Sequence, residues 1–478
     1  MKYCARVILL LLLLSAVTAQ AFDSVDDTRR WAIAGVNVVD PATGTVESNQ
    51  TIVIRQGVIE AIGARESIDP ESLDLTVQLD GMYVIPGLWD MHIHLRGGPE
   101  SIAANEQWLP QYLGFGVTTV RDAGGDLPSS VLHWRAEIAQ GFRTGPRIFT
   151  ALRKIDGSNG TQPGSIEVAS PADIAAGLDY LEIAGADFVK VYDYSLPADL
   201  YPIAISQAEA RGFKTSAHVP PWVPFADLIE AGLDSVEHGI YLAKAADPDD
   251  RSVSASTTYE VASEYASYYH AIREAGDRAD KETLQKSFER MIGHGTAVVS
   301  TLNLEQQFLA HLDGVPASNP RREETPPLVL SSHDETLDFM TSIADEITED
   351  QRMIVRRTRG FLKAASDAGV MMLAGTDTGV NNPRLYAGDS LHTELEVLVA
   401  IGLTPLEALR SATMRPAQWL GVYPWLGAIP PDSAADLVIL EANPLDDIAN
   451  TRRLTAVVQQ GVYYDAGELE ELRTLRRD

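Results

Sequence analysis

Two histidines one residue apart stand inside an apolar run near residue 90, and their spacing suits a metal ion. The run reads VIPGLWDMHIHL from Val84 to Leu95, with Ile93 between His92 and His94. In an extended strand, residues i and i+2 point to the same face, so the two imidazoles project together. Neutral imidazole nitrogens are common zinc ligands, and Asp90 lies close by in the sequence. A pair of polar residues at a strand end is the competing interpretation of this motif alone.

Four later strand-like runs carry residues that also bind divalent metals. They are Lys190 in DFVKVYDY, His218 in KTSAHV, His238 in SVEHGI and Asp377 in AGTDTG. Taken singly, a buried histidine is more often a satisfied core residue than a ligand. Five strands that agree in both the type and the position of these residues are hard to attribute to packing. The set therefore predicts a metal centre.

Lys190 is the most informative residue of this set. It is flanked by Phe188, Val189 and Val191, so burial should lower its pKa and raise the fraction of neutral amine. A neutral amine can add carbon dioxide to give a carbamate, which is an anionic ligand with two oxygens, able to bridge two metal ions. The alternative is a buried ion pair between Lys190 and a carboxylate such as Asp193.

These residues need a parallel sheet to position them. Between about residues 85 and 415, short apolar runs alternate with helical stretches, which is typical of βα units. Eight such runs can be counted: VIPGLWDMHIHL, VTTVRD, RIFTALRKI, DFVKVYDY, KTSAHV, SVEHGI, AVVSTLN and VMMLAGTDTG. Eight units predict an α/β fold of the (β/α)8 TIM-barrel type, in which function sits at the C-terminal strand ends. Long connections over 241–295 and 304–368 should cap a pocket or, alternatively, pack on the barrel wall.

Both ends of the chain have a different character. Short β-type runs occur before residue 84 and again after residue 434, separated by turn residues. We therefore expect a small β-sandwich built from both chain termini, with residues 22–84 and 416–478 as its two parts and residues 85–415 as the barrel.

The first 21 residues read as an export signal. Lys2 and Arg6 precede an apolar run, and Ala19 and Ala21 flank Gln20 as in a cleavage site. The apolar run is too short to span a bilayer comfortably, so we expect no stable membrane anchor. The prediction is an exported protein, either periplasmic or secreted.

The net charge excludes some partners. It is −29 for the whole chain, and −31 without Lys2 and Arg6, the charged residues of the predicted signal. Such acidity argues against nucleic acid and anionic membrane surfaces as partners. Cys4 is the only cysteine and lies in the same segment, so no disulfide is expected in the exported chain.

These motifs together resemble the amidohydrolase superfamily, in its imidazolonepropionase-like and prolidase-like branch. The resemblance rests on the order HxH, Lys, His, His, Asp, on the phrases GADFVKVY, SVEHG and AGTDTG, and on the tail SLHTELEVLVAIGLTPLEALRSATMRPAQWLG. It implies a site of two divalent metal ions. One would be held by His92, His94 and Asp377, the other by His218 and His238, with carboxylated Lys190 as the bridge. Zinc is favoured by the histidine-rich set, although manganese or cobalt would fit the same ligands.

The activity implied by the resemblance is hydrolysis of a C–N bond in a small-molecule or peptide substrate, such as a dipeptide or an N-acyl amino acid. A hydroxide shared by two metals would attack, and Asp377 would serve as general base and then as general acid. Tyr192 and Arg384 are candidate substrate contacts. Asn159, in IDGSNG, is another, and it replaces a histidine that many relatives carry in a GGHG motif. Asparagine can donate to an oxyanion but cannot titrate.

Two other functions compete with amide hydrolysis. A single-metal deaminase or lactonase could use the same scaffold, but such deaminases place a glutamate shortly after the fifth-strand histidine, where this chain has VPPWVP after His218. A metal-free binding or assembly protein would have lost some ligands, whereas all six are present here. A homo-oligomer is left open, and the exact substrate would depend on the two long connections.

Overall fold

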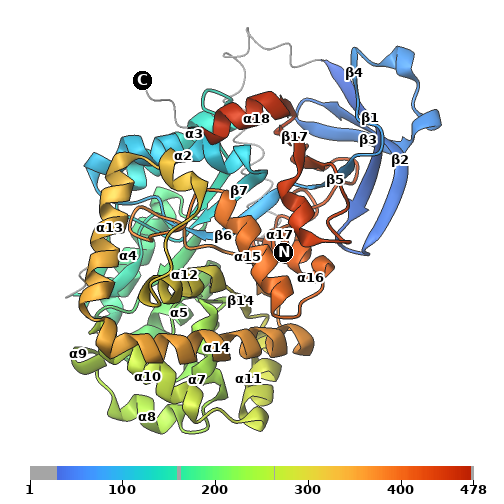
Figure 1. The fold of residues 1–478 in the computed structure, drawn as a ribbon. Helices are drawn as coiled ribbons and strands as arrows, with labels where there is room; N and C mark the ends of the chain where they lie inside the picture. The colour runs from blue at the N-terminus through green and yellow to red at the C-terminus, as the bar shows by residue number, and fades with distance from the viewer. Residues whose placement is uncertain (1–28, 159–162, 263, 475–478) are drawn as a thin grey trace.

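Strands from both ends of the chain form one mixed sheet. The computed structural model describes residues 29–158, 163–262 and 264–474, so the predicted signal peptide (residues 1–21) and Asn159 lie outside the described residues. The strands of this sheet are β1 (Arg30–Asp40), β2 (Thr45–Arg55), β3 (Val58–Ala64), β4 (Leu75–Gln78), β5 (Tyr83–Pro86), β16 (Leu437–Leu440), β17 (Leu454–Gln459) and β18 (Val462–Asp465). Their order is β18-β17-β16-β5-β1-β2-β3, with β4 paired to β1. Figure 1 shows the blue N-terminal strands beside the red β17.

The short strand β16 shows how this sheet is fixed. Its four residues, LVIL, are all fully buried. Leu437 and Ile439 pack with the apolar residues of β1 and β2, whereas Val438 and Leu440 pack with α2 and α15 on the other face. Because side chains alternate along a strand, a continuous apolar run marks a strand covered on both faces.

The remaining strands are parallel and lie in two sheets. They are β6 (Leu88–Ile93), β7 (Val117–Asp122), β8 (Arg147–Thr150), β9 (Ile155–Gly157), β10 (Ile166–Val168), β11 (Phe188–Val191), β12 (Lys214–Ala217), β13 (Ser235–Glu237), β14 (Ala297–Val299) and β15 (Met372–Leu373). One sheet is β6-β7-β8 and the other is β10-β9-β11-β12-β13-β14-β15. Each of the eight predicted runs contains a strand, and the α/β class with parallel strands is confirmed.

Backbone hydrogen bonds also link the two parallel sheets. The amide of Met91, on β6, donates to the carbonyl of Ala374 after β15 at 2.9 Å. At the other edge, the amide of Asp187 donates to the carbonyl of Thr150, on β8, also at 2.9 Å. The strands that carry the candidate ligands are thus held in a fixed order relative to one another.

The third predicted strand is shorter than expected. The run RIFTALRKI predicted one strand, but β8 ends at Thr150 and β9 begins at Ile155. Between them Leu152 has φ 59°, a left-handed conformation that ends an extended strand. The hydroxyl of Thr150 accepts a hydrogen bond from the Leu152 amide at 2.8 Å, which stabilises the turn.

Helices follow most of the parallel strands. They are α2 (Ile102–Gly114), α3 (Pro128–Ala139), α4 (Pro171–Ala184), α5 (Leu200–Ala210), α6 (Phe225–Glu230) and α15 (Asp389–Ala400). Two more helices follow α15, namely α16 (Pro405–Ser411) and α17 (Met414–Trp419), and α18 (Ala466–Arg473) follows β18. Helix α16 begins after Thr404, whose side chain accepts a hydrogen bond from the backbone amide of Glu407 as the N-cap. Among the described residues, no helix is long and apolar enough to cross a membrane.

The two long connections are largely helical. After β13 come α7 (Leu242–Ala246), α8 (Asp250–Ser256), α9 (Tyr259–Ala262), α10 (Tyr265–Asp277) and α11 (Lys281–His294). After β14 come α12 (Leu302–Leu312), α13 (Pro327–Ser342) and α14 (Ala344–Ala368). The long helix α14 packs against both α10 and α12, so the two connections form one layer (Figure 1).

The segment after β15 runs unusually close to β6. A side chain at Gly375 would place its Cβ 2.6 Å from Cγ1 of Val299 and 2.8 Å from Cβ of His92. This close approach allows the amide of Asp377 to donate to the His92 carbonyl at 2.7 Å. Glycine at 375 is therefore needed to bring the two ends of the sheet arrangement together.

We expect Gly375→Ala to lower the free energy of unfolding by about 1–3 kcal/mol, because the added methyl group overpacks a closed contact. Gly360→Ala is the matched control, because Gly360 lies in helix α14 and a Cβ added there would meet nothing within 4 Å. That change should be neutral or stabilising by about 0.5–1 kcal/mol. Urea unfolding of both variants checks this. Equal stability of the two would contradict the packing argument.

Candidate metal centre

His92 and His94 point into one space at the C-terminal end of β6, as the sequence predicts. Their Nε2 atoms lie 3.3 Å apart. Each Nδ1 is engaged behind the ring: His92 faces a carboxylate oxygen of Glu237 at 2.6 Å, and His94 donates to the Gly124 carbonyl at 2.9 Å. With Nδ1 protonated, Nε2 of each ring presents a lone pair. Burial lowers the pKa of His94 to about 3 and lowers the pKa of His92 as well, so both rings are neutral at physiological pH.

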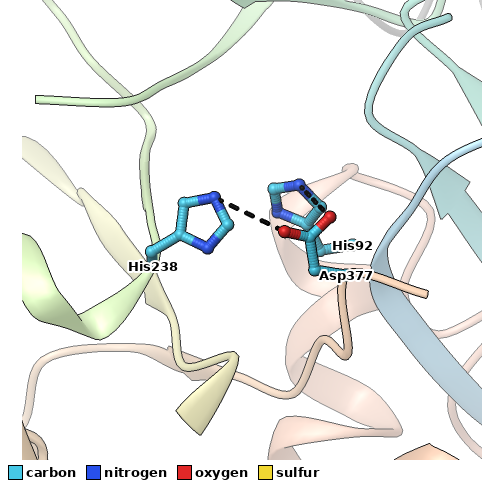
Figure 2. A group of neighbouring side chains, drawn as sticks. All are labelled: His92, His238 and Asp377. Carbon is cyan, nitrogen blue, oxygen red and sulfur yellow. Dashed lines mark ion pairs between the residues drawn. The ribbon is translucent and has the colours of Figure 1, made fainter. Parts of the chain in front are cut away.

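Asp377 closes the gap between the two histidine pairs. Its Oδ1 lies 3.1 Å from Nε2 of His94 and 3.6 Å from Nε2 of His92, while its Oδ2 lies 3.9 Å from Nε2 of His238. In Figure 2, dashed lines join the carboxylate to the rings of both His92 and His238. Ligand atoms of these three residues all lie within 4.8 Å of one another, and all three are buried.

His218 and His238 form the second pair, at the ends of β12 and β13. Their Nε2 atoms lie 3.1 Å apart. Nδ1 of His218 faces Asp193 at 2.6 Å, and Nδ1 of His238 faces the Thr301 hydroxyl at 2.8 Å. The pattern repeats that of the first pair, in which one ring nitrogen is held from behind and the other is free to bind.

Two of these residues have strained backbones. His238 has φ 69° and Asp377 has φ 61°, in a region that L-residues other than glycine rarely adopt. Such strain costs about 1–3 kcal/mol per residue and persists only where the surroundings enforce it. The conformation turns both side chains toward the same space beyond the strand ends.

Lys190 lies on β11, and its charge contributes to the lowered pKa of His92 and of His238. The side chain is fully buried, and among the described residues its Nζ has no hydrogen-bond partner. Burial lowers the pKa of Lys190 to about 8, against the opposing influence of nearby Glu237. The ion pair with Asp193 considered above is not formed, because Asp193 pairs with His218 instead.

Lys154 shows that the pKa alone does not distinguish Lys190. Burial lowers the pKa of Lys154 to about 8 as well. The amine of Lys154, however, donates to the Pro163 carbonyl at 3.0 Å and lies 5.1 Å from the centre of the Tyr192 ring. The amine of Lys190 also lies near this ring, at 5.6 Å, but among the described residues it has no hydrogen-bond partner, which is unusual for a buried amine.

Sequence reasoning missed the ion pair that supports the site. Arg121, on β7, donates from Nη2 to both oxygens of Glu237 at 2.7 Å, and its Nε donates to the Met91 carbonyl at 2.5 Å. Both side chains are fully buried. The guanidinium lies over the rings of Phe188 and Trp419, at 5.1 and 4.7 Å from their centres. The available signal was a charged residue inside an apolar strand, which is the same signal that singled out Lys190.

A cavity of about 300 Å³ is lined by three of the candidate metal ligands, His218, His238 and Asp377. Tyr192 lines it, and its ring lies 4.6 Å from that of His218, centre to centre, while its contact with substrate stays a prediction. Arg384 lines a different cavity and donates to the Val315 carbonyl at 2.8 Å, so its contact with substrate stays a prediction. Arg96 and Glu305, which the sequence did not single out, also line the cavity.

The donor set fits divalent metal ions. Four imidazoles, one carboxylate and a buried amine that has no hydrogen-bond partner among the described residues lie close together. Nitrogen and oxygen donors of this kind suit zinc and its neighbours in the first transition row.

Known proteins resemble this chain in sequence and in fold. The model of the amidohydrolase family matches residues 83–463. Imidazolonepropionase of Chromobacterium violaceum is 24% identical over 431 residues, which cover 87% of this chain and 92% of that protein. Ochratoxinase of Aspergillus niger is 24% identical over 489 residues, covering 88% and 83%. The crystal structure of a putative prolidase from Bifidobacterium longum has the same fold, with a TM-score of 0.66 and 23% identity over 93% of this chain and 98% of that one.

The chain therefore belongs to the amidohydrolase family. It is an enzyme, a hydrolase that acts on carbon–nitrogen bonds. Enzymes of this family generally use divalent metal, and the His and Asp residues described above form the candidate site.

We expect Glu237→Gln to weaken metal retention about 10- to 100-fold, because the amide has one acceptor oxygen in place of two and His92 would compete for it with Arg121 and two serines. It should also destabilise the fold by about 3–5 kcal/mol, because Arg121 would lose its buried counterion. Metal content after dialysis and urea unfolding measure the two effects. Glu230→Gln, at an exposed carboxylate on α6, is the control. Unchanged metal content in Glu237→Gln would contradict the supporting role.

Proposed function

We propose that the protein is an exported, metal-dependent amidohydrolase that cleaves the amide or peptide bond of a small substrate such as a dipeptide or an N-acyl amino acid. The observation that carries this proposal is the amine of Lys190, which is buried, has no hydrogen-bond partner among the described residues, and influences His92 and His238, one histidine of each pair. A lone buried amine is costly unless something else completes its surroundings.

His92, His94 and Asp377 would hold one ion, and His218 and His238 the other, with zinc as the favoured metal. The neutral amine of Lys190 would add to the carbon of carbon dioxide and lose one proton, which leaves an anionic carbamate. The two oxygens of the carbamate would bridge the ions. The lowered pKa of Lys190, at about 8, leaves an appreciable fraction of neutral amine for this addition.

Two divalent ions bound here would polarise the scissile carbonyl and acidify a water molecule. The chain's own residues would move the proton. Asp377 faces both histidine pairs, so it is placed to accept the proton of the water and then deliver it to the leaving amine. Tyr192, beside His218, would contact the substrate from the rim.

We propose further that the two parallel sheets close into the (β/α)8 barrel, flanked by a β-sandwich built from both termini. The hydrogen bonds from Met91 to Ala374 and from Asp187 to Thr150, one at each edge, support closure. The single sheet that unites β1–β5 with β16–β18 supports the joint terminal domain. Residues 1–21 would be removed on export to the periplasm or the medium.

Amide substrates are favoured by the relatives and by the size of the cavity. One solved neighbour is a putative prolidase and another is a Xaa-Pro dipeptidase, which shares 21% identity and a TM-score of 0.66. A cavity of about 300 Å³ accommodates a small molecule rather than a folded protein.

The first measurement is metal per protomer by plasma mass spectrometry, for the wild type, Lys190→Ala and Lys154→Ala. We expect close to two equivalents in the wild type and a clear loss in Lys190→Ala. Lys154→Ala should keep the wild-type content, because its amine already has a carbonyl partner. Dipeptides and N-acyl amino acids would then be screened for turnover that needs metal.

One equivalent that is unaffected by Lys190→Ala would overturn the bridged pair. It would favour the single-metal deaminase or lactonase instead. No metal in a folded sample never exposed to chelator would overturn metal-dependent hydrolysis altogether.

A further inference from the structure

The outer wall of the substrate cavity is aromatic. Tyr265, Tyr269, Phe308 and Phe339 line it, on helices α10, α12 and α13. The rings of Tyr265 and Tyr269 stack at 4.7 Å between centres, and the Phe339 ring meets Tyr265 edge-on at 5.6 Å. This wall belongs to the two long connections rather than to the strands that carry the metal ligands.

Glu305, on α12, is the acidic group of this wall. Its side chain is only 2% exposed, yet it lines the cavity. One carboxylate oxygen accepts a hydrogen bond from the side-chain amide of Gln351 at 2.6 Å. Within the described part of the chain, no arginine, lysine or histidine forms an ion pair with it. A buried carboxylate supported by a single neutral donor is poorly compensated.

Two other buried acids, Asp90 and Glu394, each have more hydrogen-bond donors than Glu305 has. Asp90 accepts three hydrogen bonds, from the His92 amide and from the amide and hydroxyl of Thr376. Glu394 also accepts three, from the Ser300 hydroxyl and the amides of Leu302 and Asn303. Both are satisfied within the protein without a cation. Glu305 is not satisfied in this way, and unlike Asp90 and Glu394 it lines the substrate cavity.

The surroundings of Glu305 favour a positive charge. Aromatic faces carry negative electrostatic potential and attract ammonium and guanidinium groups. Burial raises the pKa of Glu305 to about 7, and Asp377 contributes to this rise. A cation bound beside the carboxyl would favour its ionised form. Arg96, the arginine of this cavity, has Tyr192 and Asp377 as its charged or polar neighbours and leaves Glu305 uncompensated.

We propose that Glu305 and the aromatic wall bind a cationic group of the substrate, either an α-ammonium or the charged end of a lysine or arginine side chain. The inference rests on the proposed function, because it names the substrate class of the same site. Glu305 would determine specificity and would take no part in bond cleavage. Selectivity would thus come from the helical connections and chemistry from the strand ends.

Three molecules that lack a scissile amide test this on the metal-loaded enzyme. Hexanoate, norleucine and lysine share one carbon chain; norleucine adds an α-ammonium, and lysine adds a second ammonium at its end. Calorimetric titration should show binding at least about tenfold tighter at one of the two steps, as expected for a charge-assisted hydrogen bond. A gain between hexanoate and norleucine would identify an α-ammonium as the bound group. A gain between norleucine and lysine would identify a side-chain cation.

Glu305→Gln should abolish that gain while hexanoate binds as before. Glu305→Asp should keep part of it, because the charge remains. Glu346→Gln, at an exposed acid on the helix that carries Gln351, should keep all of it. Circular dichroism and metal content confirm that each variant is folded and loaded.

A gain of the same size in Glu305→Gln would overturn the inference, because any contact of the amine with bound metal persists in that variant. So would equal binding of all three molecules to the wild type. Neither result would touch the proposed function, which is tested by metal stoichiometry and turnover. A Glu305-dependent gain without amide turnover would support the cation site and overturn the proposed function.

Discussion

The buried ion pair between Arg121 and Glu237 is the interaction on which the geometry of the site depends. Taking two charges out of water is costly, and only close, multiple contacts offset that cost. Here the guanidinium reaches both carboxylate oxygens, and the hydroxyls of Ser216 and Ser235 donate to the same carboxylate. The Glu237 carboxylate also contacts Nδ1 of His92 and so fixes the orientation of that ring. The orientation of a candidate metal ligand is thus set from the opposite side of the sheet arrangement.

The second constraint is the close approach of β6 and the segment that holds Asp377. Asp90 ties the two together through the amide and hydroxyl of Thr376, and Gly375 leaves room for the backbone of His92. The left-handed conformation of Asp377 is then enforced by its neighbours rather than by its own preference. Asp90, which the sequence places beside the histidines, proves to hold the backbone and not to face the cavity.

Much of this site could be predicted because the parallel-strand pattern fixes where strand ends meet. Once eight strands were counted, the placement of His92, Lys190 and Asp377 at one end followed from their positions in those strands. The partnership of Arg121 with Glu237 could not be predicted, because it joins two strands that are not neighbours in either sheet. The left-handed turn at Leu152 was missed for another reason: it depends on one hydroxyl of Thr150, and the apolar run continues through it.

The positions of side chains in the long connections could not be predicted from the sequence. Glu305 lies in a helix whose pattern reads as ordinary, and its burial arises only because α10, α13 and α14 fold over it. The acidity of the whole chain bears on this group in a limited way. A net charge of −29 attracts cations over the surface, but mobile ions screen that field within about 8 Å at physiological salt. The field can therefore raise the rate at which cationic substrates arrive, whereas discrimination between two bound ligands must come from a charge inside the cavity. Asp193 and Asp377 also line the cavity, but each already pairs with a histidine. Under the proposed function, Glu305 is the acid that would supply this charge.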